Sequence, residues 1–340
     1  MLTLVTGATG LLGNNVVREL LMRGQEVRVL VRESSNLKSL AKLDVEHVVG
    51  ATTDKEAVKR AVFGAGQIIH CAGHVHIGWS EKDLQRDVNV EGTRNIVTAA
   101  RAEGSKLVHV SSVNALGLGT KEQPATETRA LPGIIPCGYV LSKREADTVV
   151  QEEISKGLNA VTVYPGFMLG PWDWKPSSGR LLLGLALLFT PFCPNGGCSL
   201  VDARDVASGT LSALNLGKPG SKYILAGWNL SYWELLHLMA SVTGAKGPVF
   251  PLGPVNRWIG GTFGDLLFKI TGREPEINSA SVRISAQKHY FSSELAEEQL
   301  NYSFRPARET IETAWKWFCD FGYVPVPKLK KLRIPDWAHY

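Results

Sequence analysis

Short apolar runs alternate with amphipathic stretches through the first half of the chain. The apolar runs are typical of buried strands, which we predict at residues 2–6, 26–31, 45–49, 67–71, 106–112 and 159–165. Between them, apolar residues recur three or four positions apart, which predicts helices at residues 11–24, 54–64, 81–103 and 139–156. This alternation predicts an α/β fold with a doubly wound parallel sheet and right-handed crossovers.

The second half has a less regular pattern and is richer in Trp, Pro and Gly. Helical patterns lie near residues 203–216, 231–243, 255–271 and 307–321, and a strand-like run at 222–227 is expected to rejoin the first sheet. We therefore predict a first domain of residues 1–165, to which 198–228 return. Residues 166–197 and 229–340 would form a smaller, mostly helical domain over the carboxyl ends of the strands, where ligands bind in such folds.

Composition and charge exclude some classes of partner. The 340 residues are 44% hydrophobic and 20% charged, which is typical of a folded, soluble protein. The net charge of +5, from 37 basic and 32 acidic residues, is spread along the chain, so we expect no nucleic-acid partner. The basic cluster KLKKLRIPDW at 328–337 is interpreted as a solvated terminus, with a membrane-surface or partner contact as the alternative.

Cysteine usage and the remaining apolar runs narrow the location of the protein. Five cysteines, an odd number, predict a reducing compartment, and we expect the cytoplasm. Cys193 and Cys198 have no partners at zinc spacing, so we predict a loop there and no metal site. The run at 181–189 is too short to span a bilayer and predicts a buried helix or a pocket wall, without an integral membrane segment. The N-terminus lacks the charged region of a signal peptide.

The first strand runs into the glycine loop TGATGLLG. Gly7, Gly10 and Gly13 let the backbone turn tightly and approach a pyrophosphate, and the helix that follows offers free N–H groups and the positive end of its dipole. The loop lies between a strand and a helix, which is the context that a dinucleotide site requires. We expect the cofactor to contact Gly7, Thr9, Gly10, Leu11, Leu12 and Gly13.

The end of the second strand bears on the choice between NAD and NADP. An NAD enzyme usually has an acidic residue there, whereas this chain has Arg32, with Lys38 nearby. A guanidinium suits a 2′-phosphate by charge and by its planar donor geometry, so we favour NADP over NAD. Glu33 adjoins Arg32, and a solvated Arg32 with NAD as the cofactor is the alternative.

The spacing GxxGxxG resembles that of the short-chain dehydrogenases/reductases. The chain is similar to the extended group, the NAD-dependent epimerase/dehydratase family, and within it to the dihydroflavonol-4-reductase-like branch. The resemblance covers nearly the whole chain and is strongest over residues 1–175. It is carried by TGATGLLGNNVVREL, VRVLVR, IIHCAG, NVEGTRNIV, LVHVSSVNALG, YVLSK and YPGFMLGPWD. It implies a Rossmann-type domain that binds the cofactor and a C-terminal substrate domain.

The resemblance also implies roles for single residues. Asn89 would steady the active-site backbone, Ser112 would be the catalytic hydroxyl, and Tyr139 and Lys143 the catalytic pair. Further cofactor contacts would be Cys71, Ala72, Gly73, Ser111, Pro165 and Gly166. A homodimer through the helices near 81–103 and 139–156 is expected by analogy.

Two stretches depart from the family pattern. Many relatives place an aspartate near the adenine after the third strand, where this chain has Ala51 and Thr52. Nucleotide-sugar enzymes typically show RxxNVxGP after the sixth strand, where this chain has YPGFMLGP, with Tyr164 for the arginine and Phe167 for the asparagine. An asparagine that would serve a sugar nucleotide is thus replaced by an apolar ring.

The chemistry expected of Tyr139, Lys143 and Ser112 is proton transfer to a carbonyl oxygen. Tyr139 precedes Lys143 by four residues, one helical turn. An ammonium beside a phenol stabilises the phenolate, so we expect Lys143 to lower the pKa of Tyr139 from its usual value of about 10. Ser112 would hold the substrate oxygen while Tyr139 donates the proton, or accepts it when an alcohol is oxidised.

Several aromatic residues and histidines are candidates for the substrate pocket. His74 and His76 lack a third metal ligand, so a pocket loop is favoured over a metal site. The WDW stretch at 172–174 is either core or pocket wall, and as a wall it would favour a ring-shaped, apolar substrate. The predicted pocket residues are His74, His76, Trp79, Phe167, Trp172 and Trp174.

Three functions are compatible with these features. The favoured one is an NADP-dependent oxidoreductase that reduces a ketone or aldehyde on a fairly apolar small molecule, or oxidises the alcohol. The first alternative is a nucleotide-sugar epimerase or dehydratase with tightly bound NAD(P), against which Phe167 argues. The second is a non-catalytic NADP-binding sensor or scaffold, which would not need Ser112, Tyr139 and Lys143 together.

Overall fold

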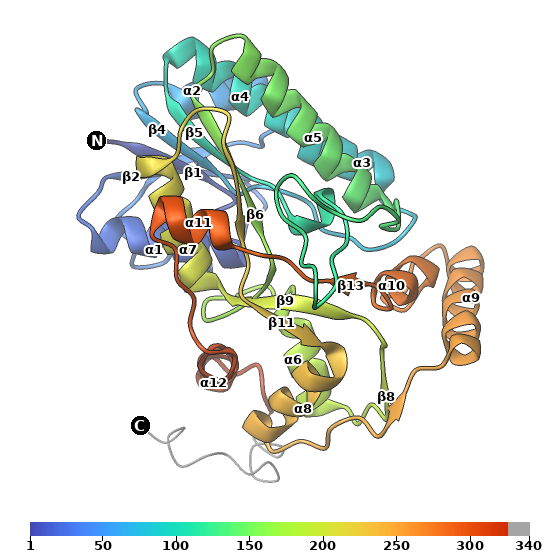
Figure 1. The fold of residues 1–340 in the computed structure, drawn as a ribbon. Coiled ribbons are helices and arrows are strands. Elements are labelled where there is room, and N and C mark those ends of the chain that lie inside the picture. Colours follow the sequence, from blue (N-terminus) through green and yellow to red (C-terminus); the bar gives the residue numbers. More distant parts are fainter. Residues whose placement is uncertain (326–340) are drawn as a thin grey trace.

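A seven-stranded parallel sheet forms the centre of the N-terminal part (Figure 1). The computed structural model describes residues 1–325. The strands lie in the order β10-β6-β5-β4-β1-β2-β3, so the chain changes direction between β1 and β4, and the prediction of a Rossmann-type sheet is confirmed. In chain order the strands are β1 (Thr3–Thr6), β2 (Val27–Val31), β3 (Glu46–Val49), β4 (Gln67–His70), β5 (Lys106–Val110), β6 (Ala160–Pro165) and β10 (Lys222–Leu225).

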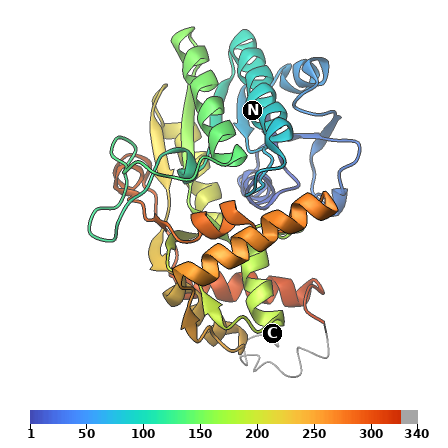
Figure 2. The same cartoon turned by 90° about the vertical axis from the view of Figure 1, so that its right-hand side faces the viewer.

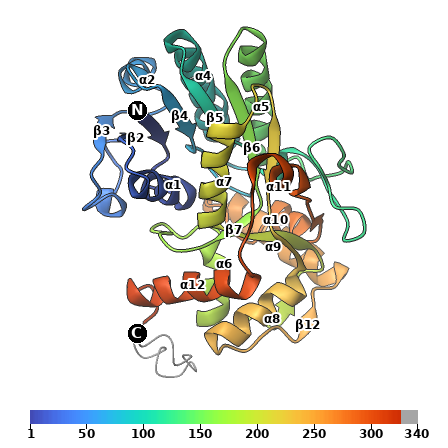
Figure 3. The same ribbon diagram turned by 60° about the vertical axis from the view of Figure 1, so that its left-hand side comes forward.

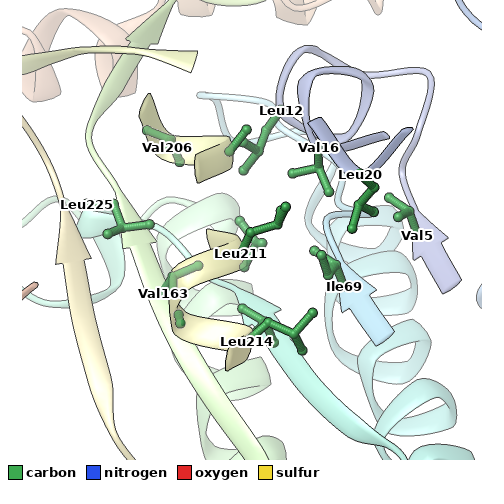
Figure 4. Packing of buried hydrophobic residues seen from close by; sticks show 14 of the residues in the cluster. Val5, Leu12, Val16, Leu20, Ile69, Val163, Val206, Leu211, Leu214 and Leu225 are labelled. Carbon is green, nitrogen blue, oxygen red and sulfur yellow. The ribbon is translucent and has the colours of Figure 1, made fainter. Parts of the chain in front are cut away.

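Helices cover both faces of this sheet. One layer consists of α2 (Lys55–Val62), α4 (Gly92–Glu103) and α5 (Gly138–Ser155). The other layer consists of α1 (Leu11–Met22), α7 (Ala203–Leu216) and α11 (Glu294–Leu300). Successive strand residues point to opposite faces, so Leu4 packs in the first layer and Val5 in the second. Figure 4 shows the second layer, where side chains of α1 and α7 gather against the sheet.

The C-terminal part is built on a small sheet that the sequence pattern did not predict. Its central strand β9 pairs with three others, and a separate ladder joins β8 to β12. The strands are β7 (Phe167–Leu169), β9 (Gly197–Asp202), β11 (Trp228–Ser231) and β13 (Lys288–His289), then β8 (Phe192–Cys193) and β12 (Phe250–Pro251). The partners of β9 come from segments far apart in the chain, so no local hairpin signal announces them.

Helices nevertheless dominate this part, as predicted. They are α6 (Gly179–Leu187), α8 (Tyr232–Thr243), α9 (Pro254–Thr271), α10 (Ser279–Ile284) and α12 (Ala307–Asp320). The apolar run at 181–189 falls largely in α6, whose Leu182 and Leu185 are buried, so the buried-helix alternative is correct for that stretch. Figure 3 shows α12 and α8 below the main sheet, and Figure 2 shows α9 running across the outside of the molecule.

The chain passes between the two parts several times. Residues 203–225 return to the main sheet as α7 and β10, whereas β9 stays in the small sheet. Within residues 1–325 we find no helix that is both long enough and apolar enough to cross a bilayer. The basic cluster at 328–337 lies outside the described residues.

The packing of α7 generates a stability prediction. Leu214 is 1% exposed in the core between α7 and the sheet, and Leu216 on the same helix is 53% exposed. Leu214→Ala should lower the free energy of unfolding by about 2–5 kcal/mol, since it leaves a cavity as well as losing burial. Leu216→Ala, the matched control, should change it by less than about 0.5 kcal/mol. Urea unfolding followed by tryptophan fluorescence measures both, and equal midpoints would contradict this packing.

Candidate active site

The glycine loop connects β1 to α1 and closes against the loop after β4. Gly7 has φ +71°, a left-handed conformation that favours glycine, and a Cβ there would lie 2.6 Å from the backbone nitrogen of Ala72. A Cβ on Gly13 would lie 2.2 Å from the carbonyl oxygen of Gly7. The two positions therefore require glycine for close backbone approach, as the dinucleotide motif demands.

No side chain caps the N-terminus of α1. Gly10 is the N-cap, and the first turn of the helix has no acidic residue. The free N–H groups and the positive end of the helix dipole face the loop, which suits a diphosphate. Leu11 and Leu12 are buried, so their expected contact with the cofactor would be made by the backbone. Thr9 is partly exposed beside them. The cradle fits NAD(P).

Arg32 and Lys38 lie in the loop after β2 and are both exposed. Arg32 makes no ion pair with any other residue between 1 and 325, including the adjacent Glu33. The Lys38 ammonium lies 5.3 Å from the ring centre of Trp174. Both cations therefore remain available to a phosphate at the end of β2.

The ends of β4 and β5 bring further predicted residues next to the glycine loop. Cys71, Ala72 and Gly73 follow β4, and burial raises the pKa of the Cys71 thiol to about 12. Ser111 donates its backbone N–H to Val163 at 2.8 Å, and its buried hydroxyl has no hydrogen-bond partner within residues 1–325. An unpaired buried hydroxyl at this edge is available to a bound cofactor.

Helix α5 brings Tyr139 and Lys143 to the same edge. The Lys143 ammonium donates to the carbonyl oxygen of Val110, the last residue of β5, at 3.0 Å. A Cβ on Gly73 would lie 3.5 Å from that nitrogen, so the lysine also borders the loop after β4. Tyr139 is buried and receives a hydrogen bond from Ser112. The structure thus gathers the three predicted catalytic side chains in one place.

The electrostatics of the pair differ from the expectation. Burial raises the pKa of Tyr139, and the hydrogen bond from Ser112 only partly opposes this. Burial likewise lowers the pKa of Lys143. The expected lowering of the phenol pKa by Lys143 is wrong for this arrangement, because the ammonium is directed at Val110 and desolvation dominates both groups.

Asn89 fastens the loop after β4 to α5. It lies in a π-helical turn, Asp87–Glu91, between α3 (Lys82–Arg86) and α4, so the predicted helix at 81–103 is interrupted there. Its side-chain oxygen accepts from His74 N–H at 2.7 Å, and its amide donates to the His74 carbonyl and to Ser142 Oγ, each at 3.0 Å. Ser142 in turn donates to the carbonyl of Tyr139 at 3.0 Å.

Asp147 is a site residue that the sequence reasoning missed. It follows Tyr139 and Lys143 on α5 at the same four-residue interval, so the spacing YxxxKxxxD was the available signal. Its carboxylate raises the pKa of Lys143, and of Tyr139 as well. It also lies 3.4 Å from Nε2 of the buried His109.

His74 and His76 pair with carboxylates. His74 Nε2 contacts Glu81, and His76 Nε2 lies 2.8 Å from Glu274, whose side chain is 2% exposed. Glu274 also accepts from the backbone N–H of Trp79 at 2.9 Å. Within residues 1–325, no group of three His, Cys, Asp or Glu side chains is placed to bind a metal ion. The two histidines therefore act here as loop anchors.

An apolar cluster surrounds Tyr139. Trp79 of the predicted pocket belongs to it, and its indole N–H donates to Ser279 at 2.8 Å. The other members closest to the phenol side are Ile77, Leu118, Ile134, Ala280 and Ile284.

The other predicted pocket aromatics lie elsewhere. Phe167, in β7, packs into the core of the C-terminal part. Trp172 and Trp174 pack against Trp317 of α12, and the Arg18 guanidinium lies 3.4 Å from the ring centre of Trp172. The WDW stretch thus packs against the C-terminal core, while Trp172 also lines a cleft between α1 and α7.

Two further features complete the site. Pro165 ends β6, and Gly166 donates its N–H to Leu225 at 3.0 Å. A Cβ on Gly166 would lie 2.5 Å from the carbonyl oxygen of Ser199, so this crossing point also needs glycine.

A separate cleft of about 560 Å³ lies between α1, α7 and residues 301–305, and neither Tyr139 nor Lys143 lines it.

Comparisons with known proteins agree with this geometry. The model of the NAD dependent epimerase/dehydratase family matches residues 3–226. A Synechocystis protein named "Putative dihydroflavonol 4-reductase" is 33% identical, over 94% of this chain and 95% of its own. Sterol demethylase protein B of Methylococcus capsulatus is 31% identical, over 95% of this chain and 100% of its own. The crystal structure of gox2253 matches with a TM-score of 0.83 and 34% identity, over 94% of this chain and 98% of that one.

These matches confirm the resemblance that the motifs predicted, including its link to dihydroflavonol 4-reductases. The family model alone covers the whole Rossmann-type sheet and all the predicted catalytic residues. The chain belongs to the NAD dependent epimerase/dehydratase family, the extended short-chain dehydrogenases/reductases, and is an NAD(P)-dependent enzyme.

Proposed function

We propose that the protein is an NADP-dependent oxidoreductase that reduces a ketone or aldehyde on an apolar small molecule, or oxidises the corresponding alcohol. The observation that carries this proposal is the meeting of Ser112, Tyr139 and Lys143 beside the glycine loop. A binding protein without catalysis would have no need of this set.

The chain's own residues would perform the proton chemistry. NADP, when bound, supplies or accepts the hydride. Gly7 and the N-terminus of α1 would hold its diphosphate, Arg32 and Lys38 its 2′-phosphate, and Lys143 its ribose near the nicotinamide. Ser112 would donate a hydrogen bond to the substrate oxygen, and Tyr139 would transfer the proton to or from it.

The surroundings of Tyr139 support an apolar substrate. The neighbouring side chains from Trp79, Leu118 and Ile284 are apolar, and the indole N–H of Trp79 is already occupied by Ser279. Such neighbours would suit an apolar substrate better than a sugar nucleotide. The names of the two curated relatives, a dihydroflavonol 4-reductase and a sterol demethylase component, also refer to ring-shaped, largely apolar compounds.

A nucleotide-sugar epimerase or dehydratase is the second candidate. The family as a whole is named for these reactions, which favours it. The place of the asparagine in the nucleotide-sugar motif is taken by Phe167, whose ring packs with the C-terminal core, and this supports the reductase instead. The two candidates differ in whether the cofactor is consumed.

Replacing the Tyr139 hydroxyl tests the reductase directly. With NADPH and a panel of apolar ketones and aldehydes, the wild type should consume NADPH, measured by its absorbance. Tyr139→Phe should lower kcat/KM by about 10²–10⁴-fold, the contribution of a positioned general acid. Tyr223→Phe is a matched control. Tyr223 lies in β10 and its hydroxyl donates to Gln299 of α11, so its loss should leave the rate unchanged.

Two results would contradict the reductase. Activity that survives in Tyr139→Phe would remove the phenol from its role. A cofactor that stays bound through gel filtration, together with turnover of a UDP- or GDP-sugar without net NADPH loss, would favour the epimerase.

Arg32 tests the choice of cofactor. Arg32→Ala should raise KM for NADPH by about tenfold or more, since a hydrogen bond to a charged group contributes about 1.5–3 kcal/mol. KM for NADH should change little. Arg23→Ala is the control, because within residues 1–325 Arg23 forms its ion pair with Glu19, near the end of α1. An equal effect on both cofactors would refute a 2′-phosphate contact.

Asp147 should control the pH dependence of alcohol oxidation. Its charge raises the pKa values of both Tyr139 and Lys143. Asp147→Asn should therefore move the rising limb, on which Tyr139 loses its proton, to lower pH. The falling limb, on which Lys143 loses its proton, should move in the same direction. The profile of kcat/KM measures both limbs, and Glu145→Gln, an exposed α5 residue paired with Arg86, should leave it in place. If both limbs of the kcat/KM profile stay at the same pH in Asp147→Asn, the Asp147 charge does not influence the pKa values of Tyr139 and Lys143.

A further inference from the structure

Helix α9 has an inverted arrangement of large and small side chains. Its buried residues are Gly261 and Gly264, while its bulky apolar side chains face outward. A Cβ on Gly264 would lie 1.9 Å from the carbonyl oxygen of Ile277, so the glycines allow α9 to pack directly on the segment leading into α10. A helix of a soluble domain normally buries its bulky side.

The outward side chains form one continuous stripe, which we call the α9 face. Trp258 is 71% exposed and Phe263 65%. A rotation of about 100° per residue places all members on one side of α9, and this helix lies on the outside of the molecule in Figures 1 and 2. The members are Val255, Trp258, Ile259, Phe263, Leu266 and Ile270. Exposed apolar residues continue at Val249 and Phe250, just before the helix.

Exposed cations near the α9 face are without acidic partners. Lys246, Lys269 and Arg273 form no ion pair with any other residue in the described range 1–325.

The nearby acids are already engaged. Asp265 accepts from the backbone N–H of Ser279 at 3.0 Å, Glu274 is held by His76, and Glu276 pairs with Arg180. An apolar stripe bordered by free cations is typical of a helix that lies in the interface of an anionic bilayer.

The same charges argue against a second copy of the chain as the occupant. A two-fold contact through the α9 face would bring Lys269 of each copy close to basic residues of the other. The carboxylates nearest this face, Asp265, Glu274 and Glu276, already accept hydrogen bonds or ion pairs from Ser279, His76 and Arg180 within the described residues. Anionic phosphate headgroups supply the missing charge, and acyl chains supply the missing apolar contact.

Helix α9 connects the exposed α9 face to the candidate active site through α10. α9 packs on α10 through its glycines, and Ala280 and Ile284 of α10 belong to the apolar cluster around Tyr139. Ser279, at the start of α10, accepts the hydrogen bond from Trp79. The helices α9 and α10 therefore lie between the exposed stripe and the phenol of Tyr139.

We propose that the α9 face docks on the surface of an anionic lipid bilayer, and that the enzyme takes a lipid-dissolved ketone or alcohol from it. The docking proposal depends only on the exposed α9 face and the charges near it. The class of substrate rests on the proposed function.

Co-sedimentation of the full chain with vesicles tests the docking. Phosphatidylcholine vesicles that contain phosphatidylglycerol should bind the wild type, and added salt should weaken the binding. The double variant Trp258→Gln, Phe263→Gln should lower the partition coefficient by roughly tenfold or more, since two apolar side chains no longer enter the interface. A matched control, Met22→Gln with Phe63→Gln, changes side chains that are equally exposed (76% and 74%) and should bind as the wild type does. Both variants retain residues 326–340, so any contribution of that segment is equal.

Several outcomes would overturn the docking. These are a wild type that binds no vesicles, or a Trp258→Gln, Phe263→Gln variant that binds as tightly as the control. Sedimentation velocity without lipid tests whether a second copy of the chain occupies the face instead. A wild type that is dimeric and binds no vesicles, together with a monomeric Trp258→Gln, Phe263→Gln variant, would assign the face to a second copy.

Activity measurements separate docking from the proposed function. With a water-soluble carbonyl, the α9 double variant should turn over as fast as the wild type, whereas with a vesicle-dissolved carbonyl it should be slower in proportion to its lost binding. Equal rates on the vesicle-dissolved carbonyl would refute delivery from the bilayer. Vesicle binding without turnover of any carbonyl would leave docking intact and reject the reductase.

Discussion

Burial of the Lys143 ammonium is the constraint around which the site is organised. A charge away from water must be compensated. Here the carbonyl of Val110 accepts a hydrogen bond from the ammonium, and Asp147 lies one turn further along α5. The end of β5 and the helix α5 are thereby held in one register. The loop after β4 also reaches this cation, since a Cβ on Gly73 would lie 3.5 Å from the Lys143 ammonium nitrogen. Three separate segments of the chain thus meet at a single cation.

The same burial decides the protonation state of the phenol. Desolvation raises the pKa of Tyr139, so the phenol keeps its proton near neutral pH and is ready to donate it. That state suits reduction of a carbonyl, in which negative charge develops on the substrate oxygen and is met by a proton. A phenolate would suit the reverse reaction better. The environment of the hydroxyl, more than the mere presence of a lysine, therefore fits the proposed role of Tyr139 as a proton donor.

What could be predicted from the sequence depends on how local its physical cause is. Alternating strands and helices, the glycine loop and the Tyr139–Lys143 interval all follow from short stretches, and the structure has them. The small sheet could not be foreseen, since β9 pairs with strands that begin at Phe167 and Lys288. The direction of the Lys143 ammonium and the packing of Trp172 against Trp317 likewise depend on distant parts of the chain. The roles of the site residues remain predictions that rest on the resemblance and on this geometry.

Helix α9 shows where pattern alone misleads about burial. The period of its apolar residues correctly predicted a helix, and that period would normally mark the bulky side as the buried one. Glycines at 261 and 264 reverse this, because α9 approaches the chain near Ile277 more closely than any larger side chain would allow. Through this close contact α9 packs on α10 by its glycine side, and the side chains of Trp258 and Phe263 are exposed to solvent. Since α10 also contributes to the apolar cluster around Tyr139, a bilayer that received the stripe would lie on the same side of the molecule as α10.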